Sequence, residues 1–168
     1  DLSARYEVSS WRKRSLKKAL SSNITIKDGL SEAKSIWTVL TENLDQKYKA
    51  RPVHTLEEIT FLGTELSENI NFKSAYLENN IIAGLVLFET DTCTHAQYIA
   101  SNSVGQKFSA LDLLFNVTIE ESIQSGKKYF SFGTSTEDNG KFLNEGLYKF
   151  KTEFGSGGQV QQFFEIKL

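Results

Sequence analysis

A polar loop that carries one glycine, set between an apolar strand and a helix, is the stretch of this sequence best suited to chemistry. The loop reads ASNSVGQKFS over residues 100–109; the strand HAQYIASN leads into it and the helix ALDLLFNVTIEESIQSG follows. Backbone N–H groups gather where a strand passes into a helix start, and with the helix dipole they can hold an anion. Gly105 permits close approach and a positive φ, and Lys107 adds a positive charge. The loop is a candidate phosphate site, with an ordinary strand-to-helix connection as the alternative.

The elements around this loop follow from the spacing of apolar residues. A continuous apolar run, IIAGLVLF, is typical of a central strand buried on both faces, and Thr55 with Glu58 forms a capping box at a helix start. Ser31 is a plausible N-cap for the helix that precedes this one. The pattern predicts helices over residues 1–22, 33–44, 56–68, 110–126 and 139–155, and strands over residues 24–26, 70–76, 81–88, 95–100, 127–135 and 159–168.

Length and composition are those of one globular domain with its own core. The chain has 168 residues and a net charge of -2, so its overall charge gives no reason to expect binding to nucleic acid. Its single cysteine, Cys93, cannot form an internal disulfide, and we interpret it as a strand or turn residue. No apolar run is long enough to span a membrane and no signal peptide opens the chain, so we expect a cytoplasmic protein. Because no methionine is present, we expect the sequence to be part of a longer protein.

The first predicted helix carries a basic face. Its cations are Arg12, Lys13, Arg14, Lys17 and Lys18. Such a face is most often solvated, although it can also meet phosphate or an acidic surface. We treat residues 1–22 as a connector and residues 23–168 as the main domain.

The order of elements and several local sequences resemble those of a known fold. Three antiparallel strands followed by strand, helix, strand, helix and strand is the order of the GNAT acetyltransferase fold, an α/β (α+β) fold with a mixed central sheet flanked by helices. The segments PVHTLEEITFL, NIIAGLVLFE, HAQYIASN, YFSFGTSTEDNG and LNEGLYKFKTEFG are similar to those of GNAT-like acyltransferases related to the FemABX aminoacyl transferases, closest to bacterial members associated with surface polysaccharide synthesis. The resemblance covers residues 49–168, and it implies that this chain is the second of two GNAT-like halves.

The resemblance implies that the polar loop binds acetyl-CoA or another acyl-CoA. Pantetheine would lie between two splayed strands, residues 97–100 and 129–133, and the phosphates would meet the loop. The loop departs from the usual Q/R-x-x-G-x-G/A pattern because no clean second glycine follows Gly105. The cofactor-binding residues that we predict are Tyr98, Ile99, Ala100, Ser101, Gly105, Gln106, Lys107, Phe108 and Ser109.

The resemblance also suggests catalytic residues. A tyrosine from the last helix protonates the leaving thiolate in many GNAT enzymes, and Tyr148 occupies that helix; Asn139 lies where a polar group often approaches the thiol. The acceptor amine must lose a proton, and His54, His95 and Glu89 are candidate bases. We predict Tyr148, His54 and Asn139 as catalytic residues, with core or structural roles as the alternatives. No metal-binding spacing is present.

The predicted function is transfer of an acyl group from acyl-CoA to an amine, on an amino sugar or another small-molecule or cell-wall precursor. One alternative is FemABX-like transfer of an amino acid from aminoacyl-tRNA, for which the first helix is the only evident basic patch. The other alternative is a non-catalytic GNAT-like module that binds substrate or a partner chain.

Overall fold

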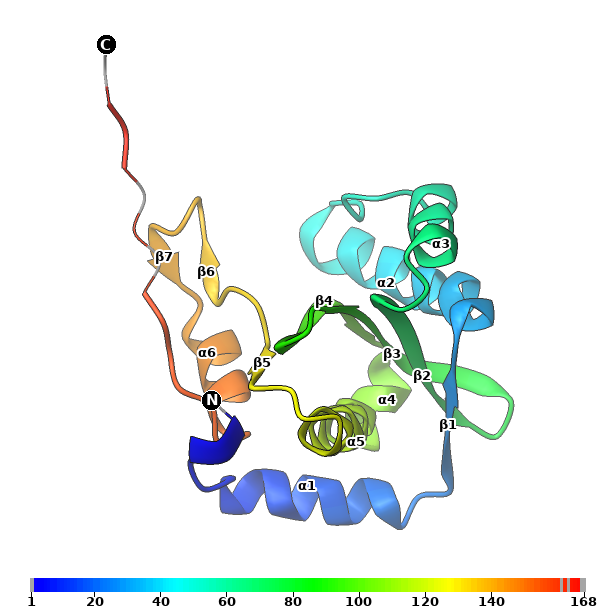
Figure 1. Cartoon of the computed structure of the whole chain (residues 1–168). Coiled ribbons are helices and arrows are strands. Elements are labelled where there is room, and N and C mark those ends of the chain that lie inside the picture. Colours follow the sequence, from blue (N-terminus) through cyan, green and yellow to red (C-terminus); the bar gives the residue numbers. More distant parts are fainter. Residues whose placement is uncertain (1, 161, 163, 167–168) are drawn as a thin grey trace.

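A five-stranded mixed sheet forms the centre of the protein. The computed structural model describes residues 2–160, 162 and 164–166. The strands lie side by side in the order of the chain, antiparallel except for the parallel pair β4 and β5 (Figure 1). They are β1 (Ile24–Asp28), β2 (Ile70–Leu77), β3 (Asn80–Glu89), β4 (Cys93–Ser101) and β5 (Tyr129–Ser131). This mixed sheet flanked by helices confirms the predicted fold class.

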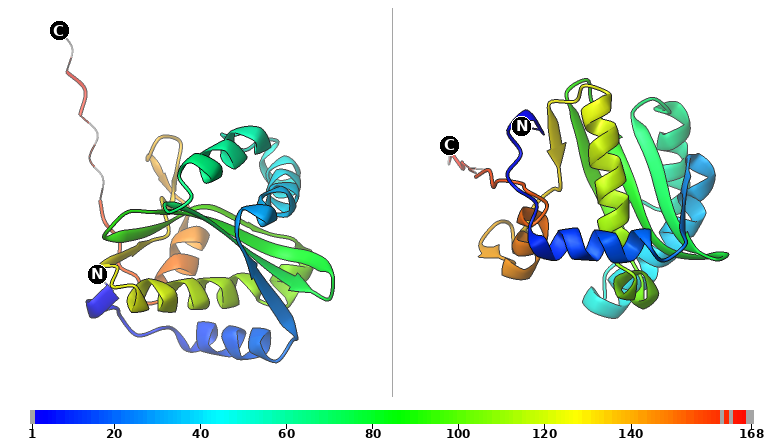
Figure 2. Two further views of the ribbon diagram at one scale, coloured as in Figure 1. Left: turned by 45° about the vertical axis from the view of Figure 1, so that its right-hand side comes forward. Right: turned by 90° about the horizontal axis from the view of Figure 1, so that it is seen from below.

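Helices cover both faces of the sheet. One face carries α2 (Ala33–Tyr48) and α3 (Leu56–Glu65), and the other carries α5 (Ala110–Gln124), with α1 (Ser10–Leu20) packed against α5 (Figure 2). The short helix α4 (Ser103–Lys107) joins β4 to α5. Among the described residues, no helix has the length and apolarity needed to cross a bilayer.

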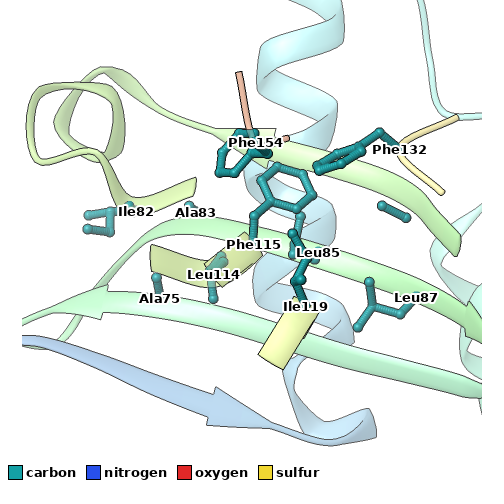
Figure 3. Packing of buried hydrophobic residues seen from close by; sticks show 12 residues of the cluster. Ala75, Ile82, Ala83, Leu85, Leu87, Leu114, Phe115, Ile119, Phe132 and Phe154 are labelled. Atoms are coloured by element: carbon teal, nitrogen blue, oxygen red, sulfur yellow. The ribbon is translucent and has the colours of Figure 1, made fainter. Parts of the chain in front are cut away.

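Two apolar clusters fix these layers. On the α5 face, Phe115 lies between Phe132 and Phe154, with ring centroids 5.0 and 5.4 Å away, and packs onto Leu85 of β3 (Figure 3). On the α2 face, the buried positions of α2 follow the helical spacing expected from the sequence, and they pack with side chains of α3 and the sheet. This second cluster includes Ile36, Trp37, Leu40, Ile59, Phe72, Val86 and Tyr98.

The N-terminal segment differs from the single helix expected over residues 1–22. A short 3-10 turn, η1 (Leu2–Ala4), and an extended stretch precede α1, which begins at Ser10. The expected basic face is also not wholly solvated. Arg12 is buried because its guanidinium forms ion pairs with Asp112 and Glu153, at 3.0 and 3.1 Å. One of the five cations of α1 therefore belongs to the interior. The second helix starts at Ala33 as expected, but the predicted N-cap is wrong, because Ser31 lies in the 3-10 turn η2 (Leu30–Glu32) and Glu32 is the N-cap of α2.

The C-terminal part contains a hairpin where a long helix was expected. Strands β6 (Thr136–Glu137) and β7 (Phe142–Leu143) pair antiparallel, and α6 (Glu145–Thr152) begins only after them. Asn144 caps α6 by accepting a hydrogen bond from the Leu147 amide, which explains why the helix starts there. The strand predicted over residues 159–168 falls partly outside the described residues; residues 159, 160, 162 and 164–166 form no strand.

Candidate functional site

The edge of β4 is only partly covered by its neighbour β5. Register pairs join Cys93, Thr94 and His95 of β4 to Tyr129, Phe130 and Ser131 of β5. Beyond these pairs β4 continues to Ser101 and pairs only with β3 among the described strands. We call the place where β4 and the chain after β5 separate, residues 95–97 and 131–134, the fork. Past the fork, β4 presents unpaired backbone groups that a bound acyl chain could meet.

A β-bulge at Gln97 changes the direction of the β4 side chains at the fork. Ala96 pairs with Leu87 and Tyr98 pairs with Val86, so Gln97 is an extra residue opposite β3. Ala96 belongs to the cluster on the α5 face, whereas Tyr98 belongs to the cluster on the α2 face. In a regular strand residues 96 and 98 would share a face. The bulge therefore turns Tyr98 toward α2 and α3.

Tyr98 meets His54 on the α2 face. The Tyr98 hydroxyl lies 2.5 Å from His54 Nδ1, and Trp37 packs edge-on against the phenol ring with centroids 4.9 Å apart. His54 directly precedes the capping box of α3, in which Thr55 and Glu58 satisfy each other's backbone amides. Burial raises the pKa of Tyr98 above its ordinary value, and a hydrogen bond with the His54 backbone offsets this only in part. The phenol therefore stays protonated at neutral pH and can donate to the imidazole.

A cleft of about 500 Å³ lies beside this pair, between the C-terminal half of α2 and the start of α3. Its polar side chains include the carboxylates of Glu42 and Asp45 and the guanidinium of Arg51, and its walls are mostly apolar. The lining residues are Trp37, Thr41, Glu42, Asp45, Ala50, Arg51, Pro52, His54, Thr55 and Leu56. Carboxylates in a partly apolar cleft suit an acceptor that arrives as an ammonium ion.

The loop expected to hold phosphate is largely folded into α4. Asn102 caps this helix, and its side chain accepts a hydrogen bond from the Gly105 amide at 2.9 Å. Gly105 is buried with no positive φ, and a Cβ there would lie 2.1 Å from the carbonyl oxygen of Ile82. The close contact that Gly105 permits is therefore with the backbone of β3. The residue of this loop that has a positive φ is Ser109, at 57°.

The remaining residues of the predicted cofactor site lie along β4, α4 and the start of α5. Tyr98, Ile99, Ala100 and Ser101 belong to β4, and Gln106 and Lys107 to α4. Phe108 is the C-cap of α4, and its ring centroid lies 5.6 Å from Lys107 Nζ. Ser109 is the N-cap of α5. The helix that fills this loop could not be read from a five-residue segment with no apolar period.

Two of the predicted catalytic residues lie on the hairpin and on α6. Asn139 occupies the turn between β6 and β7 with a φ of 53°, and its side chain is exposed. Tyr148 is 41% exposed on α6, where a Cβ at Gly158 would lie 3.6 Å from its hydroxyl. No interaction that the structure gives for these two residues joins them to His54.

The other two candidate bases are held by neighbours in the sheet. His95 Nδ1 lies 2.9 Å from Ser131 Oγ. These two residues form the last register pair between β4 and β5, where the fork begins. Glu89, at the end of β3, forms an ion pair with Lys127 at 3.3 Å. Of the three candidate bases, only His54 lines the cleft.

Lys151 was missed by sequence reasoning and lies behind the fork. Its ammonium is buried on α6 and donates hydrogen bonds to the carbonyl oxygens of Gly133 (3.3 Å) and Thr134. Burial lowers the pKa of Lys151 to about 8. Lysine is common on solvated helix faces, so only the tertiary fold reveals this position. Among the described residues, no cluster of histidine, cysteine and carboxylate side chains could hold a metal ion.

Comparison with known proteins identifies relatives of this architecture. The sequence matches the FemAB family over residues 7–164. No curated protein matches it. The fold is similar to a crystal structure of FemX, with a TM-score of 0.73 and 10% identity over 92% of this chain and 55% of that chain. It is also similar to the aminoglycoside acetyltransferase meta-AAC0020 from an uncultured soil metagenomic sample, in complex with sisomicin, with a TM-score of 0.63 and 15% identity over 89% and 99% of the two chains. A third similar structure is AAC(6')-Iy with a bisubstrate analogue, with a TM-score of 0.63 and 8% identity over 88% and 100%.

Proposed function

Because this chain belongs to the FemAB family of transferases, we propose that it moves an acyl group from an activated ester to an amine, with His54 and Tyr98 handling the proton. The observation that carries this proposal is the hydrogen-bonded pair of His54 and Tyr98, set between the free edge of β4 and a cleft. The acyl donor would lie along β4 past the fork. The acceptor amine would enter from the cleft on the α2 face.

The reaction forms a C–N bond and breaks the C–O or C–S bond of the donor. An acceptor that enters as an ammonium ion first loses one proton to water. As the resulting amine attacks, it must give up a second proton, and the leaving oxygen or sulfur must gain one. Tyr98 can pass its hydroxyl proton to His54 Nδ1 while its oxygen takes the amine proton, and the protonated imidazole can return a proton by the same route to the leaving group. Proton transfer by a positioned side chain typically contributes about 10²–10⁴-fold to a rate. Backbone N–H groups on the free edge of β4 are suited to hold the carbonyl oxygen as it becomes negative.

Two classes of donor fit this proposal, and one observation supports a preference between them. An acyl-CoA would need several free amides for its phosphates, yet in α4 the amides of Gly105 and Gln106 already donate to Asn102. An aminoacyl ester on the end of a tRNA would need fewer free backbone amides in that loop. We therefore favour an aminoacyl ester as donor, with acyl-CoA as the second candidate. The carboxylates of Glu42 and Asp45 favour an acceptor that carries an amine, such as an amino sugar or a small cell-wall precursor.

The test is a transfer assay with both donors, radiolabelled acetyl-CoA and aminoacyl-tRNA, against amine acceptors of the sugar and peptide kinds. Tyr98→Phe and Tyr148→Phe form a matched pair, because each removes one hydroxyl. We expect Tyr98→Phe to lower kcat about 100-fold with the fold retained, and Tyr148→Phe to stay near the wild-type rate. A wild-type kcat in Tyr98→Phe, or a large loss of kcat only in Tyr148→Phe, would refute the proposed role of Tyr98. No transfer with either donor would refute the proposed activity of the isolated chain.

A further inference from the structure

The extended segment before α1 is bound along the end of α6. We call residues 5–12, which comprise this segment and the first residues of α1, the strap. The amide of Tyr6 donates to the carbonyl oxygen of Gly155 at 3.0 Å, and the amide of Ser9 donates to that of Glu153 at 2.9 Å. Gly155 has a φ of +83°, and a Cβ at this position would lie only 2.2 Å from the carbonyl oxygen of Tyr6. The two backbones therefore touch, and glycine is the residue that permits this contact.

Arg12 joins the strap to two helices at once. Its guanidinium pairs with Asp112 of α5 and with Glu153 at the end of α6. The same group lies 4.1 Å from the ring centroid of Phe150 and 4.9 Å from that of Phe154. A buried cation held by two carboxylates and two rings is costly to disturb, because removing it leaves carboxylates buried without a partner. Arg12 thus ties the strap to the end of α6, which also packs on the core through Phe150 and Phe154.

The helix fixed in this way holds one side of the fork. Lys151 follows Phe150 on α6, and its ammonium donates to the backbone of Gly133 and Thr134. Gly133 lies beside β4, where a Cβ would be 3.5 Å from the His95 ring. Lys151 therefore links α6 to this backbone, in addition to the ring contact between Phe132 and Phe154 and the hydrogen bond from the Asn144 amide to the Ser135 carbonyl oxygen.

We infer that the strap positions the fork, with Arg12 as a positioning residue that acts through α6 and Lys151. Displacing the strap would release α6, and the Gly133–Thr134 backbone would lose the donor that holds it beside β4. This inference rests on the proposed transfer at the fork for its consequence in catalysis. Its structural content, a coupling between the strap and residues 131–136, does not depend on any activity.

Hydrogen exchange followed by mass spectrometry tests this coupling in the whole chain. We would compare wild type with Arg12→Gln and with Lys13→Gln, an exposed cation on the next residue that pairs only with Glu7 among the described residues. In Arg12→Gln we expect exchange to rise about tenfold in peptides covering α6 and residues 131–136, with α2 and β3 unchanged. Lys13→Gln should match wild type.

Two outcomes would overturn the inference, and a third would require a second variant. Faster exchange in α6 without any change at residues 131–136 would mean that the strap only stabilises α6. No change in either peptide would mean that Arg12 does not position α6. If Arg12→Gln loosens the whole protein, Glu153→Gln, which removes one of the two ion pairs, is judged by the same comparison of peptides.

The transfer assay adds a readout that a purely structural role would leave unmoved. With the donor at the fork and the acceptor in the cleft on α2, we expect Glu153→Gln to lower kcat about tenfold and to leave KM for the acceptor unchanged. An unchanged kcat together with altered exchange at the fork would refute the catalytic consequence. A wild-type protein without transfer activity would refute the proposed function alone, since the exchange result would still stand.

Discussion

Replacing Gly105 by alanine separates a packing role of this residue from a ligand-binding role. The new Cβ would lie 2.1 Å from the carbonyl oxygen of Ile82 and 2.4 Å from Ser101 Oγ. The hydroxyl can rotate away, but the carbonyl belongs to β3, so α4 must move by about 1 Å. Overpacking of this kind costs roughly 1–3 kcal/mol, whereas the higher helix propensity of alanine stabilises the helix by less than about 1 kcal/mol. We expect Gly105→Ala to lower the free energy of unfolding by about 2 kcal/mol.

The assay is thermal and urea unfolding, with Gly146→Ala as the matched control. Both glycines lie in helices without a positive φ, but a Cβ at Gly146 would meet only Asn144 Oδ1, at 3.6 Å. For a chain of this length, 1 kcal/mol shifts Tm by about 2–4 °C. We therefore expect Tm to fall by about 4–8 °C in Gly105→Ala and to rise by about 1–4 °C in Gly146→Ala.

The result that would refute this reasoning is a Gly105→Ala protein that melts within about 1 °C of wild type. If that variant also lost affinity for an acyl-CoA, the loop would be open for ligand, as the glycine pattern of the sequence suggests. The same pair of measurements would then restore acyl-CoA as the favoured donor. Destabilisation without any CoA binding in wild type would support a packed α4.

Three smaller predictions concern single side chains. Between about pH 7.5 and 10, Lys151 should contribute up to about 3 kcal/mol of added stability, because burial lowers its pKa from 10.5 to about 8 and its unfolded form then binds more protons than its folded form. The raised pKa values of Tyr98 and Cys93 act in the opposite direction. Urea unfolding should show a smaller gain in Lys151→Met, and an equal gain would contradict the assignment. Thr55→Ala removes the hydroxyl that accepts from the Glu58 amide and should lower the free energy of unfolding by about 1 kcal/mol; an unchanged Tm would count against the capping box. Burial raises the pKa of the Cys93 thiol, so iodoacetamide at about pH 8 should alkylate it more slowly in the folded protein than in urea, and equal rates would speak against this environment.

Local signals were sufficient for much of the fold. The spacing of Ile36, Trp37 and Leu40 predicted the buried side of α2, and the Thr55–Glu58 pair predicted the start of α3. These features depend on residues three or four positions apart, which a helix brings together by itself. The central position of β3 followed from its continuous apolar run, because only a strand covered on both faces needs one.

Features that depend on distant partners were not predictable in the same way. Arg12 looks like one of five similar cations, and only its position opposite Asp112, 100 residues along the chain, makes it part of the core. Strand β7 was predicted as part of a helix over residues 139–155 because Leu143, Leu147 and Phe150 keep helical spacing across its end. In both cases the structure depends on contacts that a short segment of the sequence does not contain.

The bulge at Gln97 explains why the pairing of His54 with Tyr98 could not be predicted from the sequence. The sequence pointed to β4 and to His54 separately, and Tyr98 was predicted as a cofactor-binding residue, not as a catalytic one. Regular alternation would turn the Tyr98 side chain toward α5, together with Ala96, and leave His54 without a partner. One extra residue in β4 reverses that orientation, so the phenol reaches the imidazole, three residues past the last register pair of β4 with β5. Bulges occur next to active sites because they re-aim a side chain and interrupt pairing at the same point. Here both effects fall within two residues, and a donor on the β4 edge and an acceptor in the cleft would meet at Tyr98.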